Sequence, residues 1–516
     1  MSGKKIFLIS ISVKLFLLSL CLFFVAVQYE PTSSLKSGNV INTAVDVQGQ
    51  YDSLGFTELS KAASCANMDI VTYYINQRLP LNVQAQNIDA KTGIASGNTP
   101  VHFAMWDVNW DSNFEIAKML IRAGAKVTIP NSQGNQLVHT LIVPVNLDRR
   151  TELLSMLVQH GADVNAQNNE GETMSHMATY DTEKEWIGIL AKGLGFLVDF
   201  SIKNNKGETV YDLAKAVGNN TDTILDELFN RKNITILGKS GLPLARNVTI
   251  SGSTIQVGDM DLFTNERDFM GLTLLMIAVV KGDQNFAKQV LRRAGNSILN
   301  ERVADEDQNS ALHLALLHQA PDMVNFLLSQ KDTKPNIQNA FGDTPLHYIF
   351  KLDDADARKK TARALFVSES AYLKNQVNNN KLTKQQAIQY ASINIKNNKG
   401  NGFTPLELAV NLPARDAYDF IVSFLIGELL AVVPSSQSST DPVPQLAIAN
   451  STYDAAIALA NKKASSGSLG DLSFCSGVCS VGDLSSWTDA KIYFCIACEL
   501  QVQRDTLNII QSSAAL

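Results

Sequence analysis

The chain has 516 residues, more than one compact domain usually holds, so several domains or a repeat array are expected. Its 45% hydrophobic and 18% charged residues are ordinary for a soluble protein, and the 7% aromatic fraction suits helices packed on helices. With 44 basic and 50 acidic residues the formal charge is −6, which provides no general basic surface for phosphates and excludes nucleic acid as the default partner.

An apolar segment at residues 6–27 differs from the rest of the chain, because Lys14 is its only charged residue. As a helix it would be about 33 Å long, close to the hydrocarbon thickness of a bilayer. Lys4 and Lys5 precede it, which favours translocation of the chain that follows. Residues 1–30 are interpreted as an uncleaved membrane anchor or, alternatively, a cleavable signal peptide. Either interpretation makes the protein membrane-anchored or secreted, with the rest of the chain on the non-cytoplasmic side.

A short phrase, Gly-x-Thr-Pro-apolar-His, recurs along the chain. Its clear copies begin at Gly97 and Gly342, and a third copy, at Gly402, has Glu407 in place of the histidine. Looser copies begin at Gly134, Gly171, Gly207, Gly271 and Asn309, and a faint one at Gly55. Successive starts from Gly97 to Gly207 are 36 or 37 residues apart, and the spacing from Asn309 to Gly342 is 33. A fixed period of this length indicates stacked structural repeats.

The phrase, together with a Gly-Ala-Asp-x-Asn segment at residues 161–165, resembles the ankyrin repeat family, whose period is about 33 residues and whose signature is T-P-L-H-x-A. The resemblance covers about residues 55–433. It implies an all-α solenoid of helix-turn-helix units joined by short β-hairpin turns. It also implies that the motif histidines are structural, bonding backbone groups of their own turn and of the adjacent repeat. The motif residues are Thr99, Pro100, His102, His139, His176, His313, Thr344, Pro345, His347, Thr404 and Pro405.

Elementary helix chemistry gives the same interpretation. A threonine hydroxyl can cap the exposed N–H groups of a helix, and proline at the first helical position loses no needed donor. The second helix of each unit carries one apolar stripe, as at Leu153, Leu154, Leu157 and Val158. Such a short helix pair cannot bury this stripe alone, so neighbouring repeats must stack.

Two stretches interrupt the period. Residues 233–263 alternate in a strand-like way and predict a β-rich insert, and a polar run with an extra helix predicts an insertion at 351–395 within one repeat. A Pro/Ser-rich linker precedes the C-terminal tail. The expected domains are the N-terminal segment 1–30, a first repeat stack 50–231, the insert 232–265, a second stack 266–433, the linker 434–445 and the tail 446–516.

The tail contains four of the six cysteines, spaced C-x3-C-x15-C-x2-C at Cys475, Cys479, Cys495 and Cys498. The spacing is close to that of a four-thiolate zinc site. Export would instead favour two disulfides. Both alternatives, and unpaired or mixed states, stay open, and either bonded form would stabilise a tail too small for a large core. Apart from zinc in the first of these alternatives, no cofactor is expected.

No catalytic site is predicted. Five of the seven histidines occupy the repeat motif, His160 lies beside a helix-ending glycine, and only His318 has no motif role, so nothing indicates a catalytic triad. Gly238, Lys239 and Ser240 resemble the end of a phosphate-binding loop, but the earlier glycine that such a loop requires falls at Asn233. We therefore expect that the protein is not an enzyme.

Two aromatic pairs are candidate binding residues, since tryptophan and tyrosine dominate interface energetics. They are Trp106 with Trp110 and, two repeats later, Tyr180 with Trp186. The alternative is that these rings only cover the junction between helices. The leading hypothesis is an interaction protein that binds a protein partner of unknown identity on the concave face of the solenoid, with membrane contact through residues 1–30 if these are retained. An effector or enzyme activity in the tail, or a purely structural spacer, are the alternatives.

Overall fold

The computed structural model describes residues 55–77, 79–86, 97–106, 111–141, 147–179, 197–217, 234–240, 242–251, 254–398, 402–430, 448–464 and 488–513. The chain divides into two compact units, residues 1–293 and 294–516. The apolar segment 6–27 lies outside the described residues. Among the described helices, none is both long and apolar enough to cross a membrane.

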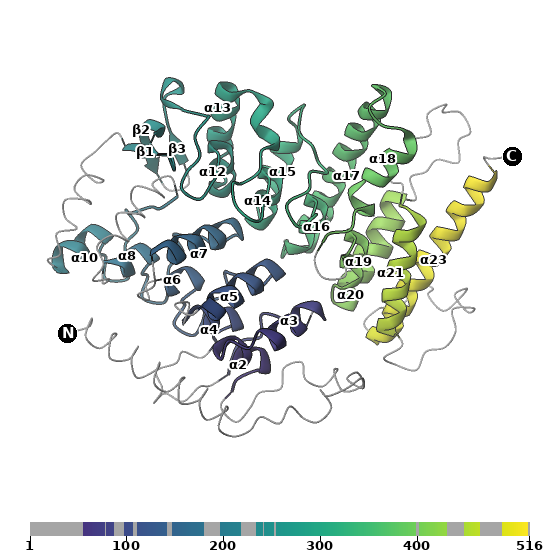
Figure 1. Cartoon of the computed structure of the whole chain (residues 1–516), viewed down its shortest axis with the longest axis horizontal. Helices are drawn as coiled ribbons and strands as arrows, with labels where there is room; N and C mark the ends of the chain where they lie inside the picture. Colours follow the sequence, from purple (N-terminus) through teal and green to yellow (C-terminus); the bar gives the residue numbers. More distant parts are fainter. Residues whose placement is uncertain are drawn as a thin grey trace. The chain divides into compact units, whose positions relative to one another are not determined.

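The first unit is built from short helix pairs (Figure 1). Its helices are α2 (Glu58–Ser64), α3 (Met68–Asn76), α4 (Pro100–Trp106), α5 (Asp111–Ala123), α6 (Leu137–Thr140), α7 (Leu147–Gln159), α8 (Met174–Ala178), α10 (Val210–Val217), α12 (Leu274–Lys281) and α13 (Gln284–Ala294). The first helices α2, α4, α6, α8 and α10 contact one another in chain order. Consecutive repeats therefore stack, as the periodicity predicts, and the faint copy at Gly55 forms the helix pair α2–α3.

The second unit has the same pattern of short helix pairs and also contains three longer helices, α17 (Ala355–Asn378), α21 (Asn450–Ala464) and α23 (Asp489–Ser513), among its described residues. Its other described elements are η2 (Asn296–Asn300), α14 (Ala311–Leu317), α15 (Pro321–Leu328), α16 (Pro345–Tyr348), η3 (Ile349–Lys351), α18 (Lys384–Tyr390), η4 (Ser392–Asn394), α19 (Pro405–Val410), α20 (Ala414–Tyr418) and the π-helix η5 (Asp419–Leu430). Within this unit α14, α16, α19 and α21 follow one another in contact (Figure 1). The mostly helical architecture of stacked repeats confirms the solenoid.

The motif proline and threonine lie at the starts of helices, as helix chemistry predicts. Helices α4, α16 and α19 each begin at the motif proline. At α19 the Thr404 hydroxyl accepts a hydrogen bond from the Glu407 N–H at 3.3 Å, which satisfies one donor of the first turn. The apolar stripe of α7, from Leu153 to Val158, is buried between repeats. This stripe therefore forms part of the core between neighbouring repeats.

The glycine that opens each repeat takes a left-handed backbone conformation, with φ between 67° and 82° at residues 55, 97, 134, 171, 207, 271, 342 and 402. The predicted start of one repeat, at Asn309, is wrong by one residue. In the copy assigned to begin at Asn309, the left-handed residue is Gln308, with φ of 52°. The repeat therefore begins one residue earlier. Glutamine accepts this conformation at a cost of about 1–2 kcal/mol, because its Cβ crowds the backbone.

Three antiparallel strands form the insert between α10 and α12. They are β1 (Ile234–Leu237), β2 (Pro243–Ser251) and β3 (Thr254–Gln256), in the order β1-β2-β3, followed by the short helix η1 (Asp259–Asp261). The carboxylate of Asp283 fixes β3 to the next repeat. It accepts the Ile255 N–H at 2.8 Å and, through its other oxygen, the Phe286 N–H at the start of α13. The insert thus packs on the repeat α12–α13, and both belong to the first unit.

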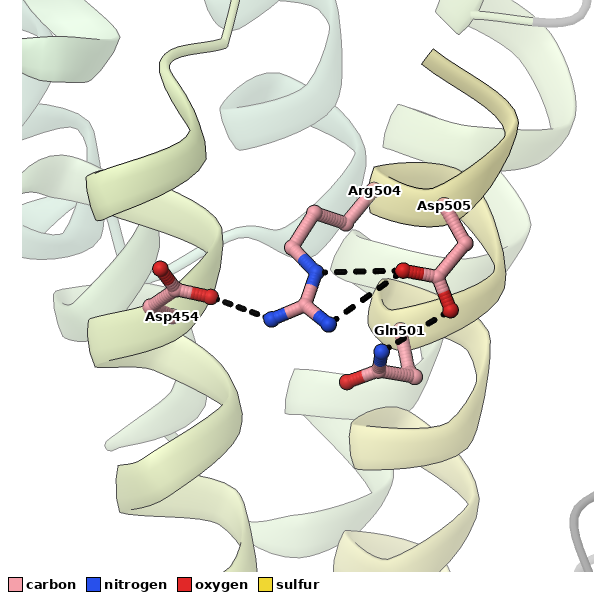
Figure 2. A network of polar contacts seen from close by, with 4 residues as sticks. All are labelled: Asp454, Gln501, Arg504 and Asp505. Atoms are coloured by element: carbon pink, nitrogen blue, oxygen red, sulfur yellow. Dashed lines mark hydrogen bonds and ion pairs between the residues drawn. The ribbon is translucent and has the colours of Figure 1, made fainter. Parts of the chain in front are cut away.

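The tail helices α21 and α23 pack on each other and on the last repeat. Tyr493 of α23 donates its hydroxyl to the Leu412 carbonyl at 2.8 Å, and the Ala449 N–H bonds to the side chain of Asn394. Figure 2 shows an exposed network between the two helices, in which Arg504 pairs with Asp454 and Asp505. The tail therefore adds one more helical pair to the end of the second stack.

Candidate interaction surface

The motif histidine of each repeat is bonded on both sides of its ring, as His313 shows. The Ser310 N–H and hydroxyl both lie within bonding distance of Nδ1, at 3.2 and 2.8 Å, while Nε2 contacts the Asp343 carbonyl of the next repeat at 3.0 Å. Because Nδ1 accepts from a backbone N–H, the ring is neutral and Nε2 carries the proton that it donates. Burial lowers the pKa of His313 to about 4, which keeps the ring neutral.

The other motif histidines repeat this geometry. Their Nε2 atoms contact carbonyl oxygens of the following repeat, namely His102 on Asn135, His139 on Ala166 and Glu172, His176 on Glu208 and His347 on Phe403. Burial lowers the pKa of His102 to about 4 and also lowers those of His139 and His176. In the structure these rings join neighbouring repeats, and none is free to accept a proton from a substrate.

Where the histidine is missing, other side chains close the same turn. Asp212 and Glu407 each accept hydrogen bonds from the N–H and hydroxyl of the preceding threonine, at 2.7–2.9 Å. At the repeat beginning at Gly271, the Thr273 N–H approaches the Met276 sulfur at 3.5 Å. These substitutes reproduce the contact within the repeat but not the histidine's bond to the next one. The loose copies therefore fold as repeats although their fourth motif residue differs.

Sequence reasoning missed a second link between repeats, made by asparagine. The Asn339 oxygen accepts the N–H groups of Phe341 and Asp343, and its amide donates to the Asn309 oxygen of the preceding repeat at 3.0 Å. The same link joins Asn131 to Asn98, Asn168 to Asn135 and Asn397 to Asp343. In the first three of these links the asparagine lies three residues before the repeat glycine, and this recurrence was the available signal, whereas Asn397 lies five residues before Gly402. These asparagines are structural, which leaves the neighbouring exposed residues to meet a partner.

In the first unit the tips of three hairpin turns form a continuous polar edge, here called the turn ridge (residues 131–135, 168–172 and 204–208). The Asn169 N–H donates to the Gln133 carbonyl at 3.1 Å, and the Asn205 N–H to the Glu170 carbonyl at 2.9 Å. The amides of Asn169 and Asn205 also each donate to the turn before. The exposed side chains of the ridge are Ser132, Gln133, Asn169, Glu170, Asn205 and Lys206. The ridge is therefore held in register while its outer side chains stay accessible.

The predicted aromatic residues do not enter this geometry. Trp106 is the last residue of α4, but its side chain lies outside the described part of the chain. Trp110, Tyr180 and Trp186 also lie outside it. Their role in binding stays a prediction.

Cys495 and Cys498 are buried in α23, and each is disulfide-bonded, as is Cys65. Side chains three apart on a helix have Cβ atoms about 5–6 Å apart, farther than the roughly 3.5–4.5 Å of a disulfide. Cys495 and Cys498 therefore bond to other cysteines and not to each other. Cys475 and Cys479 lie outside the described residues. Within the described residues no cluster of three or more His, Cys, Asp or Glu side chains could hold a metal ion.

Three stretches of the chain match sequence models of one family. Residues 254–339 match ankyrin repeats (3 copies), residues 138–181 match ankyrin repeats (many copies), and residues 96–132 match the single ankyrin repeat. No curated protein sequence matches the chain. Each matched stretch contains at least one motif histidine that joins neighbouring repeats, namely His102, His139, His176 or His313. This chain is an ankyrin-repeat protein.

Proposed function

We propose that the protein is an exported binding scaffold that recognises a protein partner along the turn ridge and the adjoining first helices. Ankyrin repeats are a protein–protein interaction module. The observation that supports a binding surface here is the bonding of the turns to one another. Because that bonding fixes the backbone before a partner arrives, little conformational entropy is lost on association. Trp106, Trp110, Tyr180 and Trp186 are proposed as additional contacts.

A charge exchange on the ridge tests this proposal. In the full-length protein, Glu170→Lys combined with Lys206→Glu changes two exposed side chains without changing net charge. The matched control, Asp69→Lys with Arg292→Glu, makes the same exchange on exposed positions of the second helices α3 and α13. We expect cross-linked partner from cells of the source to be lost with the ridge variant and kept with the control. Equal recovery with both variants would refute the ridge as the binding surface.

Export is the second part of the proposal, with the apolar segment 6–27 as anchor or signal peptide. It is supported by that segment and by the disulfides of Cys495 and Cys498, because disulfides persist in oxidising compartments. We further propose that Cys475 and Cys479 are the bonding partners in the tail. The intact mass of the native protein, alkylated with chelator but without reductant, shows both whether residues 1–27 are retained and whether the tail cysteines are disulfide-bonded. Retention or loss of residues 1–27 distinguishes anchor from secretion, and alkylation of all four tail cysteines that depends on the chelator would instead indicate zinc.

A further inference from the structure

The insertion within the repeat that begins at Gly342 has a charge opposite to that of the rest of the chain. Residues 357–394 contain seven basic residues, namely Arg358, Lys359, Lys360, Arg363, Lys374, Lys381 and Lys384, and a single acidic one, Glu369. Their formal charge is +6, whereas the whole chain carries −6, so the remaining residues carry −12. No acidic residue occurs from 370 to 406. A basic segment in an otherwise acidic chain favours binding of a negatively charged partner.

Within residues 357–394 the one acidic residue, Glu369, does not offset this charge at the surface, and the other acidic residues of the insertion, Asp353, Asp354 and Asp356, precede this stretch. Glu369 is buried in α17, and its Oε1 accepts hydrogen bonds from the Ser392 hydroxyl at 2.5 Å and the Ser392 N–H at 2.9 Å. Burial raises the pKa of Glu369 to about 7, so its negative charge is weakened as well as hidden. Glu369 therefore joins α17 to η4 by hydrogen bonds and adds no negative charge to the exposed surface of residues 357–394.

Five of these seven basic residues form two groups. Those at the start of α17 hold the helix in place: Arg358 is buried and donates to the Leu352 carbonyl, Lys359 pairs with Asp419, and Arg363 lies over the Phe424 ring. At the far end, Lys381, between α17 and α18, and Lys384, the first residue of α18, are exposed. Neither forms an ion pair with another described residue. These two lysines are available to a partner.

The end of the insertion, residues 374–386, is here called the cationic tip. Helix α17 has 24 residues and is about 36 Å long, three times the length of the eight-residue α15 beside it. The chain then turns through Asn380, with φ of 56°, and the Lys381 N–H bonds back to the Gln376 carbonyl. Thr383 and Gln386 form a capping box that starts α18. The lysines thus stand on a defined turn between two helices (Figure 1).

We propose that the cationic tip docks a short acidic segment of the protein partner. This inference rests on the proposed function and adds the chemistry of one contact. The tip offers lysines and neutral amides such as Asn379 and Gln385, which suit carboxylates. Nucleic acid fits less well, because a duplex engages many phosphates at once and the chain's other residues, at −12, would repel it. A short acidic peptide presents its charge to the tip alone.

Binding of a fluorescent ten-residue polyglutamate peptide to the full-length protein, followed by anisotropy at low salt, tests the proposal. Lys381→Gln with Lys384→Gln should weaken binding about fivefold, as expected for the loss of two exposed ion pairs. The matched control, Lys215→Gln with Arg292→Gln, removes two exposed charges from the first unit and should leave binding unchanged. Affinity should also fall as salt rises. Circular dichroism verifies that both variants fold.

Equal affinity of the two variants for polyglutamate would overturn the proposal, as would tighter binding to a DNA duplex than to the peptide. The outcome is separable from that of the ridge experiment. If the ridge variant loses the cross-linked partner while the tip variant binds polyglutamate normally, the scaffold function stands and the acidic contact is refuted. If the tip variant alone fails to bind the peptide and the ridge variant keeps its partner, the acidic contact stands and the ridge is refuted.

Discussion

Replacing His313 by alanine should lower the free energy of unfolding by about 4 kcal/mol. The substitution leaves the buried Ser310 N–H and hydroxyl without their acceptor and the Asp343 carbonyl without its donor. It also removes a ring that packs edge-to-face on Tyr348, with centroids 5.0 Å apart. Since Ser310 and Asp343 belong to successive repeats, the loss weakens both the first turn of α14 and its attachment to the next repeat. Urea denaturation followed by circular dichroism measures the change.

The control is His318→Ala, which removes a histidine at the end of the same helix that belongs to no repeat motif. It should cost only about 1 kcal/mol, because His318 is half-buried and lies outside the repeat motif. Equal destabilisation by the two variants would show that the motif histidine has no special role in stacking.

The same geometry predicts how stability depends on pH. The folded-state pKa of His313 is about 4, below the 6.5 of an ordinary histidine, so between these values the unfolded chain binds more protons than the folded one. The contribution of each such histidine to the free energy of unfolding is therefore fully present above pH 6.5. It falls by about 1.4 kcal/mol per pH unit as the pH decreases toward 4. His102 contributes in the same direction and over the same range. His313→Ala should accordingly show a shallower decline.

The sequence predicts the repeats well because their stability comes from local chemistry that recurs. Threonine capping, proline at the first position and a buried apolar stripe each leave a mark at a fixed place, and these marks located α4, α16 and α19. The histidine bonds followed from the resemblance. The loose copies were harder to recognise in the sequence, because Asp212, Met276 and Glu407 take the place of the histidine that accepts the threonine N–H.

Long-range contacts left no comparable signal. Glu369 and Ser392 are 23 residues apart, and their bond depends on how the insertion folds back. Likewise, Gln308 was aligned wrongly because glutamine gives no hint of a left-handed backbone, whereas glycine does. The cysteine spacing alone left disulfides, zinc and unpaired thiols open. The helical position of Cys495 and Cys498, visible only in the fold, decides which cysteines cannot bond to each other.

Replacing Gly171 by alanine should destabilise the first unit by about 3 kcal/mol or more. Its φ of 73° alone costs an alanine about 1 kcal/mol. The larger part comes from packing, because an added Cβ would lie 2.7 Å from the backbone nitrogen of Asn205 and 2.5 Å from its side-chain oxygen. Backbone cannot move aside cheaply here, since the Asn205 N–H is bonded to the Glu170 carbonyl. The two turns would have to separate, which breaks the turn ridge.

Gly207 provides a matched control at the equivalent position of the next repeat. Its φ is 80°, so alanine meets similar backbone strain there, but an added Cβ would lie within 4 Å of no described atom. Gly207→Ala should therefore cost only about 1 kcal/mol, and the difference between the two variants, measured by urea denaturation, isolates the contact between neighbouring turns. If both alanines cost the same, the turns would not be in the close contact on which the rigidity of the ridge depends. If Gly171→Ala unfolds the unit while Gly207→Ala does not, the glycine serves the stacking of repeats as well as the bending of its own turn.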